Sequence, residues 1–235
     1  MNRSRLARFT VTLGSFACVF AFAAASGGCA IGHLIGGMLQ NEEYQKLVET
    51  PPEYADLSGK RIAVVVDADL SVTYNHPKLV EMVTTGVTMR IGRDVPEAAV
   101  VHPQTILAWQ WRTPQWNAMP YADLCESLNV DRVVFIDIYE YRLNPPGNRW
   151  LWEGVCAASV GVIEREGFDP DMFADSFNVT SNFPSVTGVE RTAASEGQIE
   201  TGLLAQFIQK TAWLFHDHLE PKYPDKYRPE AQAQR

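Results

Sequence analysis

Arg61-Ile-Ala-Val-Val-Val-Asp67 holds five apolar residues in a row between two charged ones, and this segment is the clearest indication of the fold class. A continuous apolar run of this length predicts a strand that is covered on both faces, as in a parallel sheet. A similar run, Val133-Val-Phe-Ile136, lies in the segment from Asp131 to Tyr141 and predicts another strand of the same kind. Both runs indicate an α/β domain.

Helical patterns separate these strands. Pro77 precedes a stripe of apolar residues at helical spacing over residues 79–91, and Pro120 precedes a second, shorter helix. A short strand is expected between them, at residues 98–102. Because strands alternate with helices in this half, the strands are expected to pair in parallel through right-handed crossovers.

The pattern changes after Tyr141. The turn sequence Asn144-Pro-Pro-Gly-Asn148 predicts an antiparallel hairpin into a long strand at residues 149–163. Alternating polar and apolar residues predict a half-exposed strand at 177–183, and an amphipathic helix is expected over 196–219. The order β-α-β-α-β-β-β-α predicts an α/β fold of two or three layers around a mixed sheet of about five strands.

The composition fits one soluble domain. The chain has 235 residues, of which 46% are hydrophobic and 20% charged, so it is neither disordered nor a polytopic membrane protein. We expect the α/β domain at residues 60–219. A tether that ends in Pro51-Pro52 is expected at residues 29–59, and a flexible tail at residues 220–235.

The first 28 residues have the pattern of a secretory leader. Arg3, Arg5 and Arg8 are the only Lys, Arg, Asp or Glu residues before residue 42, and an apolar run from Phe9 to Ala25 follows them. A basic start, an apolar stretch and then small residues are typical of a signal peptide. Residues 1–28 are therefore predicted to be one.

Cys29 follows the small residues Ser26, Gly27 and Gly28. This junction resembles the lipobox of bacterial lipoproteins, in which the cysteine is lipidated and becomes the mature N-terminus. Ser26 stands where that motif usually has Leu. The resemblance implies lipidation of Cys29, with palmitate as a typical acyl group. Cleavage after Ala25 by the ordinary signal peptidase, or an uncleaved single span, are the alternatives.

The charge balance bears on partners and location. Loss of the leader removes three arginines and changes the net charge from −8 to −11. Such a chain is repelled by phosphate polyanions, so no nucleic-acid partner is expected. Ala30 is not the acidic residue of the enterobacterial inner-membrane retention signal, which favours the outer membrane. We expect a cell-envelope protein that faces the periplasm, is held in the membrane through Cys29, and has an envelope protein as its partner.

The layout of residues 60–219 resembles that of small bacterial envelope lipoproteins. The segments Lys60-Arg-Ile-Ala-Val-Val-Val66 and Leu128-Asn-Val-Asp131 stand where the α/β domains of the curli-export lipoprotein CsgG and the amino-terminal domain of TolB have a first strand and a small-residue turn. The chain lacks the long membrane-spanning insertions of CsgG-type proteins. The resemblance therefore implies a binding or assembly module, and it supplies no catalytic residues and no cofactor.

Tryptophan is concentrated in two segments. Trp109, Trp111 and Trp116 lie within eight residues, on a predicted loop between the second strand and the next helix. Trp150 and Trp152 are expected on one face of the fourth strand, where they would extend the same patch. Tryptophan is favoured at binding hot spots and membrane interfaces, so these five are the candidate binding residues. Packing against the sheet edge is the alternative.

Asp67 and Asp69 suggest an enzymatic alternative. They follow a predicted parallel strand, at the edge where doubly wound sheets bind ligands. They resemble the first motif of haloacid-dehalogenase-type phosphatases, which implies a nucleophile and an acid/base beside Mg²⁺. The acidic segment 164–175 is then the candidate metal motif, through Asp169, Asp171 and Asp175. Leu70 replaces the usual Gly, no apolar strand directly precedes Asp169, and no lysine lies at a strand end where it would hold a phosphate. The alternative is that Asp67 and Asp69 only end the strand and start a loop, and we expect the chain not to be an enzyme.

Histidine and cysteine give weaker signals. On a helix the rings of His216 and His218 point about 160° apart, so no metal site is expected from them. His102 lies at the end of the second strand without a partner in sequence. Cys125 and Cys156 remain in an exported chain as either a disulfide or two buried thiols.

Overall fold

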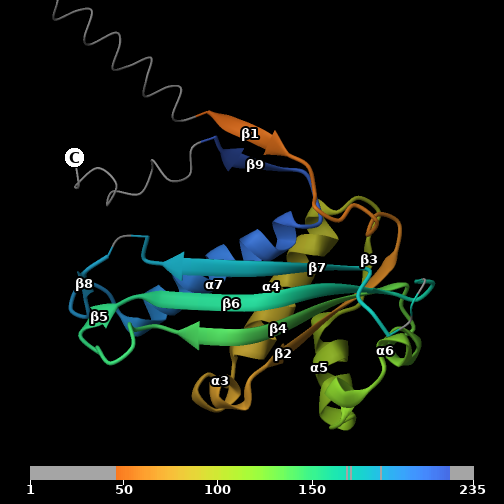
Figure 1. Ribbon diagram of the computed structural model, residues 1–235, viewed down its shortest axis with the longest axis horizontal. Helices are drawn as coiled ribbons and strands as arrows, with labels where there is room; N and C mark the ends of the chain where they lie inside the picture. Colours follow the sequence, from red (N-terminus) through yellow and green to blue (C-terminus); the bar gives the residue numbers. More distant parts are fainter. Residues whose placement is uncertain (1–45, 168, 170, 186, 223–235) are drawn as a thin grey trace, which may run out of the picture. The chain divides into compact units, whose positions relative to one another are not determined.

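The computed structural model describes residues 46–222, except 168, 170 and 186 (Figure 1). The predicted signal peptide, Cys29, most of the tether and most of the tail lie outside the described residues. The described chain divides into residues 49–219, which hold the sheet and all the helices, and a small unit of residues 46–48 and 220–222. In the small unit the Lys222 N–H donates to the Lys46 carbonyl at 2.9 Å. This bond lies one residue beyond β1 (Leu47–Thr50) and β9 (His218–Pro221), which pair as a two-stranded sheet.

A five-stranded mixed sheet is the centre of residues 49–219 (Figure 1). Its strands, in spatial order, are β3 (Ala99–Val100), β2 (Arg61–Ala68), β4 (Arg132–Arg142), β6 (Gly154–Glu164) and β7 (Asp175–Phe183). β2 runs parallel to β3 and β4, whereas β6 is antiparallel to β4 and β7. A separate two-stranded sheet joins β5 (Leu151–Trp152) to β8 (Val189–Glu190). The predicted fold class is confirmed, including the parallel half and the hairpin.

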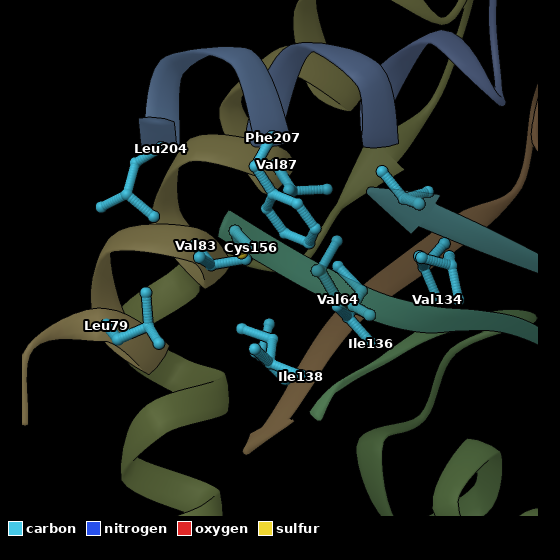
Figure 2. Packing of buried hydrophobic residues seen from close by; sticks show 14 of the residues in the cluster. Val64, Leu79, Val83, Val87, Val134, Ile136, Ile138, Cys156, Leu204 and Phe207 are labelled. Carbon is cyan, nitrogen blue, oxygen red and sulfur yellow. The ribbon is translucent and has the colours of Figure 1, made fainter. Parts of the chain in front are cut away.

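Helices cover both faces of the sheet. Apolar residues of α4 (Leu79–Asp94) and α7 (Glu196–Trp213) pack on the face that carries Val64 and Ile136. Figure 2 shows Val83 and Val87 of α4 and Phe207 of α7 pointing toward these strand residues. The other face, which carries Ala63 and Val65, packs against α5 (Pro103–Arg112) and α6 (Tyr121–Leu128). The domain therefore has three layers.

Two segments predicted as loops are helical. α5 occupies most of the predicted tryptophan loop, with Pro103 in its first turn and the His102 side chain accepting a hydrogen bond from the Gln104 N–H at 3.3 Å. α3 (Leu70–Asn75) follows β2, where a loop was expected after Asp69. The 3₁₀ turn η1 (Trp116–Ala118) lies between α5 and α6. The predictions missed α3 and α5 because each has one short apolar side only: Val72 is the only buried residue of α3.

Three other boundaries differ from the predictions. The predicted fourth strand is divided into β5 and β6, because β5 pairs with β8 rather than with the central sheet. α7 ends at Trp213 although the apolar spacing continues to Leu219. Leu57, in the predicted tether, is fully buried in the core, and the Tyr54 N–H donates to the Leu214 carbonyl at 2.9 Å. The packed domain thus begins before Lys60.

None of the helices in the described part of the chain has the length and apolar character that a membrane crossing requires.

Candidate functional site

The candidate tryptophans do not form one patch. Trp109 and Trp116 are half-buried on the α5–α6 face, with ring centroids 6.2 Å apart, and the Trp116 ring lies 6.1 Å from that of Phe135. Trp152 belongs to the core on the other face, is 2% exposed, and donates its indole N–H to the Ala194 carbonyl at 3.0 Å. For these three residues the structure shows packing, the alternative reading of the sequence.

Trp111 and Trp150 are the two candidates that face solvent. Trp111 is 88% exposed near the end of α5, and Trp150 is 81% exposed just before β5. Trp150 and Trp152 were expected on one face of a continuous strand, and this expectation is wrong because Trp150 lies outside β5. Exposed indole rings of this kind can bury large apolar areas against a partner.

Carboxylates gather at the carboxyl end of β2 and β4. Asp67 and Asp137 are directly paired in the parallel register. Burial raises the pKa of Asp137, and the negative charges of Asp67 and Asp69 raise it further. The Asp67 carboxylate accepts a hydrogen bond from the Ala68 N–H at 2.9 Å, and Asp69 precedes the first turn of α3.

The acidic segment of the phosphatase hypothesis lies elsewhere. Asp67 shares its face of the sheet with Val65, whereas Asp175, at the start of β7, shares the opposite face with Val179. Asp169 lines a cavity beside Glu164, at the end of β6. The proposed pairing of these acids with Asp67 around one Mg²⁺ is therefore wrong. Within the described residues, no group of three or more His, Cys, Asp or Glu is arranged to hold a metal ion.

His216 and His218 lie beyond the end of α7, so the expectation that both are helical is wrong. Their rings are 6.1 Å apart and nearly perpendicular. The His218 ring stacks on Trp213 at 4.6 Å, and His216 Nε2 lies 3.7 Å from a carboxylate oxygen of Asp94. These contacts join the end of α7 to the end of α4.

The two cysteines are separate buried thiols. Cys125 packs on the α5–α6 face and Cys156 on the α4–α7 face, so the sheet lies between them. Burial raises the pKa of Cys125 to about 11 and raises that of Cys156 as well. The structure therefore shows two buried thiols and no disulfide between Cys125 and Cys156.

An open cavity of about 610 Å³ lies at the carboxyl end of the parallel strands. Residues from α3, the end of β4, the following turn and the segments beside the β5–β8 sheet line it: Ser71, Val72, Asn75, His76, Tyr141, Arg142, Leu143, Asn144, Arg149, Arg191 and Glu196. Ligands of open α/β sheets bind at this edge. The sequence analysis indicated this edge of the sheet through Asp67. It did not predict the arginines of the cavity, because they belong to no recognisable motif.

The three arginines of this cavity are held differently. Arg142 pairs with Glu140 at 3.0 Å and Glu153 at 2.9 Å. The Arg191 guanidinium pairs with Glu196 at 3.0 Å and lies 4.8 Å from the ring centroid of Trp152. The side chain of Arg149 makes no ion pair or hydrogen bond with any residue that the structure describes.

A second cavity, of about 460 Å³, lies at the opposite end of β4 and β6. Beside it, Arg132 is 5% exposed and donates to Asp56 at 2.6 Å and to the Tyr54 hydroxyl at 3.1 Å. The Tyr54 hydroxyl donates to Glu164 at 2.5 Å. Burial raises the pKa of Tyr54, as does Glu164, and the hydrogen bond from Arg132 lowers that of Asp56. This network is satisfied internally.

No protein-family model matches the chain, and no curated protein does either. Solved structures with a similar arrangement include three from bacteria. A PelC dodecamer from Paraburkholderia phytofirmans has 13% identity, covers 73% of this chain and 97% of that chain, and has a TM-score of 0.40. Lipoprotein GNA1162 from Neisseria meningitidis has 12% identity, 64% and 96% coverage, and a TM-score of 0.40. Protein XCC0632 from Xanthomonas campestris has 12% identity, 72% and 89% coverage, and a TM-score of 0.43. These likenesses are distant.

Proposed function

We propose that this chain is a lipoprotein of the bacterial cell envelope, held in a membrane by acylated Cys29 and facing the periplasm. The observation that carries the proposal is the leader, in which three arginines and an apolar run to Ala25 precede small residues and the cysteine. A covalently attached acyl chain stabilises membrane association by about 0.8 kcal/mol for each buried CH₂ group.

The α/β domain is, in this proposal, a binding or assembly module with an envelope protein as partner. Two features support a binding role. Trp111 and Trp150 present exposed indole rings, and a cavity lies at the sheet edge where α/β proteins bind ligands. The outer membrane is the proposed location, because Ala30 follows the cysteine.

The anchor is tested with the full chain, produced in a bacterium that processes lipoproteins. We expect the wild-type protein in the membrane fraction, with a mass that has lost residues 1–28 and gained acyl chains. The Cys29→Ser variant should leave the membrane fraction, whereas the control Cys18→Ser, which alters only the leader, should stay attached. Membrane attachment of Cys29→Ser, or an unmodified thiol at position 29 in the wild-type protein, would contradict the proposal.

A further inference from the structure

The cavity at the carboxyl end of β2 and β4 concentrates positive charge in an acidic protein. The whole chain has 28 Asp and Glu against 20 Lys and Arg, yet three arginines and a single carboxylate, Glu196, line this cavity. Asp67 and Asp69 precede α3, and Glu140 and Glu153 form ion pairs with Arg142. The lining itself is thus cationic while its surroundings are acidic.

Two of the arginines are available to a ligand. Arg142 is occupied, because its Nε and both of its terminal nitrogens donate to Glu140, Glu153 and the Asn144 carbonyl. Arg191 is held in place but keeps donor capacity for a ligand. One terminal nitrogen donates to Glu196, and the other donates to the Arg149 carbonyl at 3.4 Å. The guanidinium also lies over the Trp152 ring. A guanidinium that is already positioned loses little side-chain entropy when it binds an anion.

Arg149 supplies the second guanidinium. It is exposed beside the cavity, and the described residues give its side chain no acidic partner. Its backbone carbonyl accepts from Arg191, so the two residues are adjacent at the cavity although they are 42 positions apart in the sequence. Both side chains therefore line one cavity, and guanidinium groups are suited to the planar oxygens of a carboxylate or phosphate.

The remaining lining suits a hydrophilic ligand of moderate size. The His76 ring packs edge-on against Tyr141 with centroids 4.6 Å apart, and Asn75 and Ser71 add amide and hydroxyl groups from α3. The volume of about 610 Å³ lies within the range of small-molecule sites. We infer that this cavity binds a small hydrophilic ligand through a carboxylate or phosphate group held by Arg149 and Arg191.

The anionic group belongs either to a free small molecule or to an acidic sugar in a longer polymer, since both present the same oxygens. The inference deepens the binding role proposed above and rests on it, but it does not rest on the acylation of Cys29. Loss of anion binding in a protein that still sits in the membrane would remove only this inference. Loss of membrane attachment alone would not contradict the proposed anion binding.

The test uses the full chain extracted from membranes in mild detergent and titrated by calorimetry. The probes are inorganic phosphate, glucuronate and an oligomer of galacturonate, with glucose as the neutral comparison. We expect saturable binding of at least one anion, weaker at high salt, and no binding of glucose. An oligomer affinity well above that of glucuronate identifies a polymer as the source, and equal affinities identify a free anion.

Variants decide whether the arginines are responsible. Arg149→Gln should weaken binding at least about tenfold, because a hydrogen bond to a charged group is lost. Its folding should be unchanged, since its side chain has no partner among the described residues. Arg112→Gln, an exposed arginine of α5 outside the cavity, is the matched control and should bind as the wild type does. Absence of saturable binding for all three anions, or equal affinity in Arg149→Gln and the wild-type protein, would overturn the inference.

Discussion

Arg132 and Arg149, near opposite ends of the longest strands, carry the same side chain in contrasting surroundings. Arg132 is buried at the start of β4 and bonded to Asp56 and Tyr54. Arg149 is exposed beside the cavity at the other end of β4, without a side-chain partner among the described residues. A buried guanidinium stabilises the fold through its partners, and losing them is costly, whereas an exposed, unpaired one is available to a ligand. The contrast separates an end of the sheet that serves stability from an end that serves binding.

The largest effect is expected when the buried arginine, Arg132, is replaced. Arg132→Met should destabilise the protein by about 3–5 kcal/mol, because Glu164 and the Tyr54 hydroxyl lose their cationic partner in a largely buried site. Urea unfolding of the full chain measures this. Arg149→Gln, as the matched control, should change the free energy of unfolding by less than about 0.5 kcal/mol. Similar losses in both variants would contradict the distinction between the two ends.

A smaller change at the same end removes one hydroxyl. Tyr54→Phe should lower the free energy of unfolding by about 1–2 kcal/mol, because the hydroxyl both donates to Glu164 and accepts from Arg132. Tyr74→Phe is the control, since Tyr74 is 85% exposed. If the two variants unfold at the same urea concentration, the network around Arg132 contributes less than its geometry indicates.

Anion binding at the cavity end of the sheet is tested by measuring how an anion changes the free energy of unfolding. Phosphate at ten times its dissociation constant should stabilise the wild-type protein by about 1.4 kcal/mol through mass action, provided that it binds only the folded state. Thermal unfolding of the full chain at matched ionic strength measures this, with chloride replacing phosphate in the reference. Arg149→Gln should gain almost nothing from the same phosphate concentration. An equal gain in both proteins would place the stabilising anion elsewhere.

The smallest expected effect concerns Asp137. Burial and the charges of Asp67 and Asp69 raise its pKa in the folded protein. The folded state therefore holds the proton more tightly than the unfolded state, and stability falls as the pH rises through the interval between the ordinary and the raised pKa. Asp137→Asn removes this penalty and should slightly raise the free energy of unfolding at pH 7, measured by urea unfolding.

The gain from Asp137→Asn should disappear below about pH 4, where the aspartate is protonated in both states. A gain that stays constant from pH 3 to pH 8 would mean that the packing of the new amide, and not the charge, is responsible.

The central strands could be predicted from the sequence because burial on both faces leaves an unmistakable run of apolar residues. The run at 61–67 became β2, and that at 133–136 became the middle of β4. α5 could not be predicted, because Pro103 and Ile106 are its only fully buried residues and its tryptophans are half-buried or exposed. The C-terminal end of α7 was missed because apolar spacing continues through Phe215, which packs in the core after the helix has ended.

The binding cavity could be predicted only as an edge of the sheet. The rule for parallel strands pointed to the carboxyl end of β2, and α3 and the end of β4 do line the cavity there. Arg149 and Arg191 come together through the two-residue pairing of β5 with β8, which is too short to leave a periodic signal. The prediction of a single exposed tryptophan patch was wrong for Trp109, Trp116 and Trp152. The sequence alone does not distinguish an aromatic residue that fills a core from one that binds a partner.

The β5–β8 pairing also limits how this protein can vary. The Arg191 N–H donates to the Trp150 carbonyl at 2.8 Å, so the ladder sets the direction in which the guanidinium leaves the backbone. Side chains alternate along a strand, and a slip of one residue turns each of them to the opposite side. A slip of one residue in the pairing of β5 with β8 would thus aim position 191 away from Trp152, whereas a change of length in the turn at Pro145-Pro146 can leave this pairing untouched. Homologous chains that keep the ligand should therefore keep the register of β5 with β8 and vary in length at that turn.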